Sequence, residues 1–482
     1  MSNLGFSSDH TFHQRERIAH WDAVARRMDE RSGWGHYYHR RLRDIYQSII
    51  PQGLRVLEIG SGRGDLLSYM QPNFGVGVDF SPEMVRRASR RHPELCFLQS
   101  DAHSLSSLDA RFDSIIISDL VNDVWDVQTV LQQVKQLTTT NTRIIINFYS
   151  RLWEFPLALA ARLGLAAPTL GQNWLTVEDV NNLLHLTGFE MVRQWDEIVW
   201  PLRTPFLDNL CNRFLVKLWP FRWLALTHLV IARPAPERYH LPQNPTVSVI
   251  VPARNEAGNI AELVARTPDM GRGTELVFVE GHSKDNTYET IRKVIADHPD
   301  QNWHLLQQKG MGKGDAVRTG FAHAKGDILI ILDADMTVPP EDLPRFVNVL
   351  CTGQGEFVNG VRLVYPMEDE AMRLWNLMGN KFFTLAFSWL LGQFVKDTLC
   401  GTKALWRRDY ESIVANREYF GDLDPFGDFD LLLGAAKLNL RILDLPVRYR
   451  KRTYGTTNIK RWKHGWLLLR MAMLAAKRLK FV

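Results

Sequence analysis

Short runs of apolar residues, each followed by a mixed polar and apolar stretch, recur along most of this chain. In the run Ile328–Leu332, five apolar residues stand between Asp327 and Asp333. Such a run predicts a short strand that is buried on both faces of its sheet. Comparable runs begin near residues 54, 76, 112, 143, 229, 247 and 275. The alternation of strands with helical stretches predicts an α/β fold built on mainly parallel sheets.

The alternation is interrupted by a proline-rich segment. Residues 233–245 contain four prolines within thirteen positions, which is the composition of a linker. A chain of 482 residues is also too long for a single hydrophobic core. We therefore predict two domains, residues 1–233 and residues 246–482, joined by a linker at residues 234–245.

The first strand of the N-terminal half ends in a glycine-rich turn. Gly60, Gly62 and Gly64 follow this strand and precede a helical stretch. Glycines let the backbone approach a ligand closely, and we expect the turn to leave its amide donors exposed. Two later strands end in acids, Asp79 and Asp101. Asp79 is placed to bind ribose hydroxyls, as in nucleotide-binding βαβ units.

These residues resemble the class I S-adenosylmethionine-dependent methyltransferases, and the resemblance extends from about residue 15 to residue 233. It implies a Rossmann-like domain with S-adenosylmethionine as its cofactor. In this comparison Glu58, Gly60 and Gly62 border the methionine part of the cofactor, Asp79 holds the ribose, and Asp101 lies near the adenine. No distinct catalytic base is evident, and many such enzymes need only proximity and in-line orientation, because the methyl donor is already activated. A structural copy without catalysis is the alternative.

Two segments beside these motifs could cover the ligand pocket of the N-terminal half. Residues 1 to about 45 predict helices that could form a lid, although a plain N-terminal helix is the simpler interpretation. Residues 151–228 predict an apolar insertion, rich in Trp, Leu and Phe, that caps the acceptor pocket or touches a membrane.

In the C-terminal half, the central strand ends on two carboxylates, Asp333 and Asp335. Open α/β sheets bind ligands at the carboxyl edge of their strands. Hard oxygen ligands one residue apart suit Mg²⁺ or Mn²⁺, which keeps positions open for substrate phosphates. A glycine-lysine loop that contains Lys313 suits a diphosphate and lacks the spacing of a P-loop. An acidic strand end or a helix N-cap is the plainer alternative for the two acids.

The order of these motifs resembles the family-2 glycosyltransferases with the GT-A fold, in particular the polyprenyl-phosphate branch similar to dolichyl-phosphate mannosyltransferase, over about residues 246 to 465. The resemblance implies a nucleotide-sugar donor and a metal held by Asp333 and Asp335. The residues that it implies at the nucleotide sugar are Pro252, Arg254, Asn255, Glu256, Glu280, Asp285 and Lys313. Two motifs depart from the family: Glu280-Gly-His stands where Asp-Asp-Gly or Asp-Asn-Gly is usual, and Thr-Thr-Asn-Ile-Lys replaces a Ser-Lys pair.

The same resemblance places residues 397–403 and 427–431 on the acceptor side, and two kinds of acceptor remain open. A polyprenyl phosphate is already ionised and needs no strong base. Its binding is assigned to Arg450, Arg452 and Lys460. A glycan hydroxyl needs a base, for which Asp428 and Asp430 are the candidates. The alternative role of these two acids is to cap the helix that follows.

The excess of basic residues lies in the C-terminal tail. Residues 448–482 contain eleven Lys and Arg and no Asp or Glu, whereas the rest of the chain has 47 basic against 53 acidic residues. Trp462 and Trp466 are interleaved with these charges, which favours an anionic membrane surface over nucleic acid as the partner. A C-terminal helix that docks on its own domain is the alternative.

Other features predict a cytoplasmic protein that is peripheral to the membrane. No apolar run reaches the length of a spanning helix, and no N-terminal apolar stretch predicts a signal peptide. The four cysteines are scattered, as is typical of reduced thiols in the cytosol.

The sequence thus predicts a metal-dependent, inverting glycosyltransferase that moves a sugar to a polyprenyl phosphate or a glycan, fused to a methyltransferase. The alternative is transfer to a glycan hydroxyl, with an S-adenosylmethionine-binding domain that serves only as a scaffold. No recognised nucleic-acid-binding motif occurs.

Overall fold

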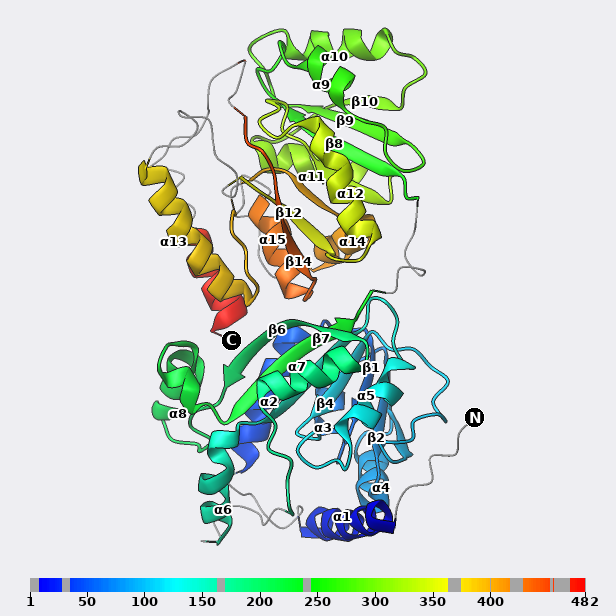
Figure 1. Ribbon diagram of the computed structural model, residues 1–482, viewed down its shortest axis with the longest axis vertical. Helices are drawn as coiled ribbons and strands as arrows, with labels where there is room; N and C mark the ends of the chain where they lie inside the picture. The colour runs from blue at the N-terminus through cyan, green and yellow to red at the C-terminus, as the bar shows by residue number, and fades with distance from the viewer. Residues whose placement is uncertain are drawn as a thin grey trace. The chain divides into compact units, whose positions relative to one another are not determined.

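The computed structural model describes residues 8–27, 35–162, 170–236, 244–362, 374–398, 400–416, 428–450, 454 and 469–481, and it gives the backbone alone for residues 8–10, 35, 36, 374–382 and 428. The chain divides into two compact units between Ala235 and Pro236. Each unit is built on its own seven-stranded sheet (Figure 1).

The N-terminal sheet has the strand order β3-β2-β1-β4-β5-β7-β6. Its strands are β1 (Arg55–Ile59), β2 (Phe74–Asp79), β3 (Cys96–Gln99), β4 (Ser114–Ser118), β5 (Arg143–Tyr149), β6 (Phe189–Glu197) and β7 (Thr227–Pro234). Strands β1 to β5 are parallel, and β7 is antiparallel to both β5 and β6. The strand order reverses between β1 and β4, so their carboxyl ends form the switch point at which such sheets bind ligands.

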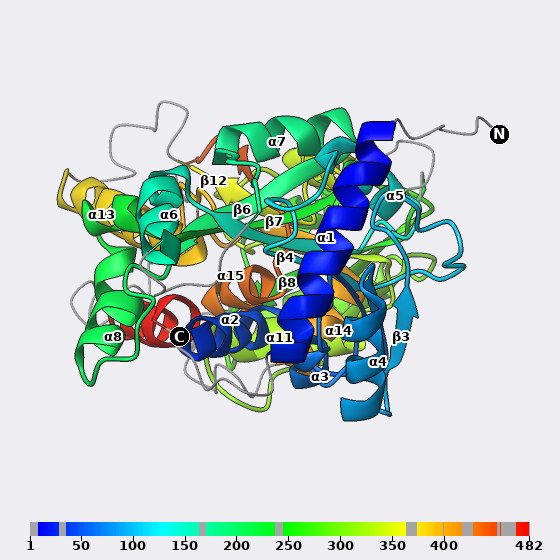
Figure 2. The same cartoon turned by 90° about the horizontal axis from the view of Figure 1, so that it is seen from below.

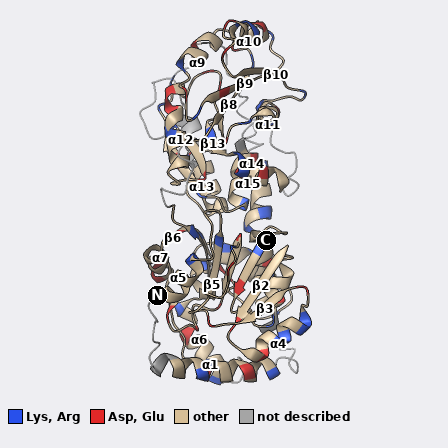
Figure 3. Cartoon of the chain, turned by 90° about the vertical axis from the view of Figure 1, so that its right-hand side faces the viewer, with Lys and Arg blue, Asp and Glu red and all other residues tan. Residues whose placement is uncertain are grey.

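Helices cover both faces of this sheet, because its central strands are apolar on both sides. In β4, Ile115 and Ile117 pack in one core cluster with Leu184, while Ile116 packs in a second cluster with Tyr46. The helices are α1 (Ser8–Arg27), α2 (Gly35–Ile49), α3 (Asp65–Tyr69), α4 (Pro82–Arg91), α5 (Val127–Lys135), α6 (Glu154–Arg162), α7 (Val177–Leu186) and α8 (Leu207–Asn209). Acidic and basic residues alternate along α1 (Figure 3).

The interpretation of residues 151–228 as an insertion is wrong for part of that segment. Strand β6 belongs to the sheet and pairs along its length with β7. Helix α7 packs on the sheet through Val180 and Leu184. The half-buried pattern of an edge strand is weaker than the continuous apolar run of a central strand, so the apolar pattern of the sequence does not reveal β6. Short helical turns fill much of the rest: η1 (Arg151–Trp153), η2 (Leu210–Phe214), η3 (Leu215–Lys217) and η4 (Phe221–Leu224).

The C-terminal sheet has the strand order β10-β9-β8-β11-β13-β12-β14. Its strands are β8 (Val247–Ala253), β9 (Thr274–Glu280), β10 (Trp303–Gln307), β11 (Ile328–Ile331), β12 (Phe357–Val361), β13 (Lys403–Trp406) and β14 (Ile442–Pro446). Strands β8 to β11 are parallel, and β13 is antiparallel to β11 and β12. The run at residues 328–332 is a fully buried central strand, as predicted.

The helices of this unit are α9 (Ile260–Arg266), α10 (Thr287–Ala296), α11 (Lys313–His323), α12 (Leu343–Cys351), α13 (Leu374–Leu391), α14 (Arg407–Ala415) and α15 (Asp428–Lys437), with the short turns η5 (Pro340–Asp342) and η7 (Ala476–Lys480). They form two core clusters, one on each side of the sheet. Within the described ranges, no helix combines the length and the apolar character needed to cross a bilayer.

Candidate active sites

The glycine-rich turn joins β1 to α3 at the switch point of the N-terminal sheet. Gly60, Gly62 and Gly64 have φ angles of +75°, +51° and +74°, which side chains with a Cβ rarely adopt. A Cβ at Gly62 would meet no atom within 4 Å, whereas a Cβ at Gly64 would lie 2.3 Å from the Phe97 ring. Gly62 therefore borders open space, which fits the predicted position of S-adenosylmethionine, and Gly64 allows close packing.

The amides of this turn are already hydrogen-bonded. Gly60 N and Ser61 N donate to Val78 O at 2.8 and 3.0 Å, and Gly62 N donates to Asp79 Oδ2 at 2.9 Å. The expectation that the turn leaves its amide donors exposed is wrong for these three residues, because the end of the neighbouring strand β2 supplies the acceptors.

Two buried carboxylates hold the turn in place. Asp79 accepts from Gly62 N and from Ser81 N, each at 2.9 Å. Burial raises the pKa of Asp79 to about 6, against the lowering effect of these two hydrogen bonds. Glu58 Oε2 accepts from Leu67 N at 3.1 Å, and burial raises the pKa of Glu58 well above its ordinary value. Both acids orient the backbone beside the predicted cofactor position.

Helix α1 crosses the carboxyl ends of neighbouring strands (Figure 2). Gln14 Nε2 donates to Asp101 Oδ2 at 2.7 Å, just after β3. Trp21 Nε1 donates to Asp123 Oδ2 at 2.8 Å, in the loop after β4. Asp101 also accepts from His103 N at 2.9 Å. These contacts favour a covering role for α1 over that of a plain N-terminal helix.

A polar cluster that the sequence did not single out lies directly after β4. Asp119 Oδ1 accepts from Tyr38 OH at 2.8 Å and from Asn147 Nδ2 at 2.6 Å. Burial raises the pKa of Asp119 to about 7, although the two hydrogen bonds oppose this rise. The side chain of Leu120 would lie 3.0 Å from a Cβ at Gly60, so the cluster borders the glycine-rich turn. Asp119 is therefore a candidate for proton transfer beside the glycine-rich turn.

The signal for Asp119 in the sequence was its place at the end of a buried strand. Its φ of 54° is uncommon for a residue with a side chain, and such strain is frequent at functional sites. Its partners come from α2 and β5, and Tyr149 lies near by, its ring centre 5.9 Å from that of Tyr38. No spacing in the sequence links these segments, so the cluster could not be recognised from motifs.

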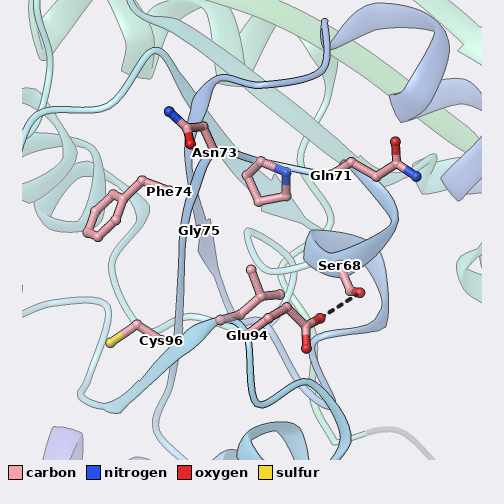
Figure 4. A pocket seen from close by; sticks show the side chains of 9 residues that line it. Ser68, Gln71, Asn73, Phe74, Gly75, Glu94 and Cys96 are labelled. Carbon is pink, nitrogen blue, oxygen red and sulfur yellow. Dashed lines mark hydrogen bonds between the residues drawn. The ribbon is translucent and has the colours of Figure 1, made fainter.

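A separate pocket opens where β2 and β3 begin (Figure 4). It is lined by residues 68, 71–75 and 94–96, and Ser68 Oγ lies 3.4 Å from Glu94 Oε1. The residues predicted to bind the cofactor follow the opposite ends of the strands. We assign this pocket no part in the predicted chemistry.

In the C-terminal unit, the loops after β8 and β9 are bonded to each other. Asn255 N donates to Ser283 Oγ at 3.0 Å, and Asn255 Oδ1 accepts from Lys284 N at 2.7 Å. Glu256 N donates to Thr287 Oγ1 at 2.9 Å. The structure thus brings together two segments that the sequence predicted at the nucleotide sugar.

The predicted nucleotide-sugar residues differ in how far they are available to a ligand. Glu280 Oε1 and Asp285 Oδ1 accept from backbone amides of their own loop, at 2.5 and 3.1 Å. Burial acts to raise both pKa values, but the hydrogen bonds outweigh it and leave each pKa below its ordinary value. Pro252 is half-buried, whereas Arg254 is exposed at the edge of the sheet.

The two acids after β11 lie at this edge and are partly exposed. Lys313 Nζ lies 2.6 Å from Asp333 Oδ1. Asp335 Oδ1 accepts from Thr337 N at 3.1 Å and from Thr337 Oγ1 at 2.8 Å. The site accommodates a positive charge beside Asp333, and its hard oxygen donors fit Mg²⁺ or Mn²⁺.

A loop from the predicted acceptor side packs against this pair. A Cβ at Gly401 would lie 2.1 Å from Lys313 Nζ and 2.2 Å from Asp333 Oδ2. Asp397, in the same loop, is fully buried and bonds to Arg362 Nε at 2.7 Å and Nη2 at 2.9 Å. This double hydrogen bond holds the loop in position.

Two further contacts bring the start of the basic C-terminal tail, at Arg450 and Tyr454, to the same edge of the sheet. Arg450 N donates to Thr337 O at 2.9 Å, which places this exposed arginine beside the loop of Asp335. The Tyr454 ring packs on Gly258, where a Cβ would lie 2.6 Å from a ring carbon. The segment therefore touches both the loop after β11 and the loop after β8.

The remaining predicted acceptor residues are less well defined. Asp430 lies within α15 and is 8% exposed. Asp428 is the first residue of that helix, and its side chain is outside the description. Arg452 and Lys460 lie outside the described residues.

Comparison with known families identifies both units. Residues 248–413 match the model for glycosyl transferase family 2, and residues 34–194 match a methyltransferase domain. The chain is a fusion of a methyltransferase domain and a family-2 glycosyltransferase domain. The sheet of the methyltransferase domain is Rossmann-like, and the glycosyltransferase domain has the GT-A fold.

The relatives of the glycosyltransferase domain include proteins named as undecaprenyl-phosphate sugar transferases. An undecaprenyl-phosphate 4-deoxy-4-formamido-L-arabinose transferase from Pseudomonas aeruginosa is 30% identical over 176 residues, covering 36% of this chain and 50% of that protein. The enzyme of the same name from Edwardsiella ictaluri is 36% identical over 213 residues, covering 43% and 61%. Glycosyltransferase AglJ from Haloferax volcanii is 28% identical over 230 residues, covering 47% and 71%. The chain spans about half the length of the first curated relatives it matches.

Proposed function

We propose that the glycosyltransferase domain transfers a sugar, with inversion and with a divalent metal, from a nucleoside diphosphate to a polyprenyl phosphate. The observation that carries this proposal is the ion pair of Lys313 with Asp333 at the sheet edge where the loops after β8 and β9 meet. Arg450, whose amide bonds to the loop of Asp335, supplies a cation for the acceptor at the same edge. The names of the relatives from Pseudomonas aeruginosa and Edwardsiella ictaluri support an undecaprenyl-phosphate acceptor.

One set of residues acts on the leaving diphosphate, and another binds the acceptor. A Mg²⁺ or Mn²⁺ ion held by Asp333 and Asp335 would neutralise charge on the leaving diphosphate. Lys313 can exchange its bond with Asp333 for charge-assisted hydrogen bonds to that diphosphate. Arg450 aligns the acceptor phosphate behind the anomeric carbon, because a guanidinium matches phosphate geometry. The acceptor phosphate is already ionised at neutral pH, so this reaction needs no protein base.

A direct transfer assay tests the proposal. Purified protein is incubated with Mg²⁺, with labelled UDP-, GDP- and dTDP-sugars, and with polyprenyl phosphate. We expect a labelled lipid-linked product with one class of donor. If nucleotide sugars bind but label passes only to a glycan, the acceptor assignment is wrong. The basic residues 448–466, which include Trp462 and Trp466, support a further expectation, that vesicles with anionic lipids increase the rate. Further along the tail, Met471 and Ala475 are buried in the same core cluster as Phe387, which fits a C-terminal helix docked on its own domain.

Transfer to a glycan hydroxyl is the rival, and one pair of variants separates the two. A hydroxyl acceptor needs a base, for which Asp430 and Asp428 are the candidates. If Asp430→Asn abolishes turnover while Arg450→Ala leaves it unchanged, the hydroxyl acceptor is favoured. We expect the reverse: Arg450→Ala abolishes turnover, and Asp430→Asn leaves it unchanged. Loss of turnover must occur without loss of folding, since Asp430 is buried.

For the methyltransferase domain we propose catalytic methyl transfer, and the Asp119 cluster is the observation that favours it over a scaffold role. S-adenosylmethionine would supply an already activated methyl group beside the glycine-rich turn. Asp119 takes the proton from an acceptor hydroxyl as the new bond to oxygen forms. Tyr38 and Asn147 hold the Asp119 carboxylate in position through their hydrogen bonds to Oδ1.

A further inference from the structure

Three metal-binding side chains gather where the strands of the C-terminal sheet begin. They are Glu275 in β9, His304 in β10 and His323 at the end of α11. One ligand atom from each residue lies within 4.8 Å of the other two. Glu275 and Glu280 lie toward opposite ends of β9, and a strand rises about 3.3 Å per residue, so the cluster is roughly 16 Å from the nucleotide edge. It is therefore distinct from the proposed glycosyl-transfer site.

The register of the two strands places these residues on one face of the sheet. His304 is the partner of Val277 in the parallel pair of β10 and β9. Residues two apart in a strand share a face, so Glu275 lies on the same face as Val277 and His304. Helix α11 covers this face, because Val317 and Phe321 pack in the same core cluster as Val277. His323, two residues after Phe321, reaches the cluster from the end of that helix.

Glu275 presents one oxygen to the cluster. Its Oε2 accepts from Ser248 Oγ and from Lys325 N, the latter at 2.9 Å. Its Oε1 is buried, has no hydrogen bond within the described part of the chain, and lies 3.4 Å from His304 Nε2. The side chain is 4% exposed. Burying a carboxylate oxygen without a hydrogen-bond donor costs free energy, and a bound cation would offset that cost.

The two imidazoles are arranged to share such a cation. His323 Nε2 is buried and has no hydrogen-bond partner among the described residues. The ring centres of His304 and His323 are 4.8 Å apart, with 68° between the ring planes. Two imidazoles that bind one zinc ion at about 2.1 Å each have ring centres about 5 Å apart. The His304 side chain is 34% exposed, and its Nε2 lies 3.0 Å from Asn302 Oδ1, a contact that an ion can displace.

We propose that Glu275, His304 and His323 form a zinc site that ties the edge strand β10 to β9 and α11. Two imidazoles with one carboxylate are a ligand set that favours Zn²⁺ over Mg²⁺. Three protein ligands leave the fourth position for water on the exposed side of His304. Ser248 positions Glu275, because its hydroxyl holds the other carboxylate oxygen. Zinc bound here stabilises the folded chain, since the unfolded chain lacks this arrangement.

Zinc binding by the full-length, untagged protein tests this proposal. The protein is dialysed against EDTA and titrated calorimetrically with ZnCl₂ in excess Mg²⁺, which occupies the Asp333–Asp335 position. We expect one equivalent of zinc per chain and a higher melting temperature. The double variant His304→Gln/His323→Gln loses both effects, whereas His185→Ala, at an exposed histidine of the methyltransferase domain, keeps them. Ser248→Ala lowers the zinc affinity by about 10- to 100-fold.

The outcomes separate this site from the glycosyl-transfer site. The variant Asp333→Asn/Asp335→Asn retains the zinc equivalent, whatever its effect on sugar transfer. If the wild-type protein takes up no zinc equivalent, or if the double histidine variant binds zinc with unchanged affinity, the proposal is overturned. Melting curves without zinc verify that the histidine variants are folded. The single variant His304→Gln, at a partly exposed position, replaces the double variant if the latter does not fold.

Discussion

Lys313 and Asp333 form an ion pair at the nucleotide edge of the glycosyltransferase domain, with Lys313 Nζ 2.6 Å from Asp333 Oδ1. The ammonium lies where a metal ion would meet this carboxylate, and both side chains are partly exposed, 25% and 29%. Binding of a metal and a diphosphate would therefore exchange partners: Asp333 turns to the metal and Lys313 turns to the phosphates. Three predictions concern this exchange and its surroundings.

The first prediction is that Lys313→Met tightens Mn²⁺ binding in the absence of nucleotide but weakens the nucleotide sugar. Without the ammonium, nothing competes with the metal for Asp333, and the diphosphate loses a charge-assisted contact. Such a contact contributes about 1.5 to 3 kcal/mol, so we expect the dissociation constant of the nucleotide sugar to rise about 10- to 100-fold. Titration calorimetry measures both affinities. Lys309→Met, at an exposed lysine of the same loop, is the matched control, and equal effects of the two variants would contradict the account.

The second prediction concerns the close packing of Gly401. A Cβ at this position would press on both members of the ion pair. We expect Gly401→Ala to reduce glycosyl turnover about 10²-fold through misplacement of the site, with a small change in melting temperature. Gly171→Ala, where a Cβ would meet no atom within 4 Å, should leave turnover unchanged. A fully active Gly401→Ala protein would contradict this prediction, because it would mean that the loop moves to accommodate the Cβ without displacing the ion pair.

The third prediction concerns the buried pair of Arg362 and Asp397. Arg362→Met leaves the Asp397 carboxylate buried without its partner, which costs about 3 to 5 kcal/mol. We expect the melting transition of the glycosyltransferase domain to fall accordingly. The double variant Arg362→Met/Asp397→Leu should recover much of that stability, since it removes the uncompensated charge. Denaturant unfolding measures the free energies, and a single variant as stable as the wild type would show that the pair does not hold the loop.

The fourth prediction is a pH dependence of methyl transfer. Asp119 must be ionised to accept a proton, so the rate should rise with pH and reach half its maximum near pH 7. Asp119→Asn should lower the rate about 10²- to 10⁴-fold and remove this dependence, while calorimetry shows S-adenosylmethionine still bound. An active variant with the original pH profile would exclude Asp119 as the base.

The same carboxylate gives a separate readout in stability. Because the pKa of Asp119 is raised from 3.8 to about 7 on folding, the folded state binds more protons than the unfolded state between these values. Asp119 therefore lowers stability as the pH rises through this range. We expect the melting temperature of Asp119→Asn, relative to the wild type, to increase from pH 4 to pH 7. A constant difference would indicate that the group is not shifted.

Residues that end a buried strand could be placed from the sequence alone. Asp79, Asp333 and Asp335 follow apolar runs whose period and length predict parallel strands, and such strands end at one edge. The pairing of Lys313 with Asp333 could not be predicted, because it depends on how α11 packs on the sheet. The Asp119 cluster likewise draws Tyr38 and Asn147 from distant segments.

Local hydrogen bonding was the other feature that the sequence did not reveal. A glycine-rich turn is recognisable by its composition, but whether its amides face a ligand depends on the neighbouring strand. Here the Val78 carbonyl and the Asp79 carboxylate lie close enough to accept hydrogen bonds from these amides. Strand β6 is hard to recognise in the sequence for a related reason: an edge strand is covered on fewer sides, so its apolar pattern is weaker.

The central claim is that the carboxylates after β11 hold a divalent ion that supports sugar transfer. The most direct measurement is the rate of sugar transfer to polyprenyl phosphate as Mn²⁺ is varied, for the wild type and for Asp333→Asn/Asp335→Asn. We predict that the wild-type rate saturates with Mn²⁺ and vanishes in EDTA, and that the folded double variant shows no transfer at any Mn²⁺ concentration. Transfer by the double variant at the wild-type rate, or wild-type transfer that persists in EDTA, would contradict the claim.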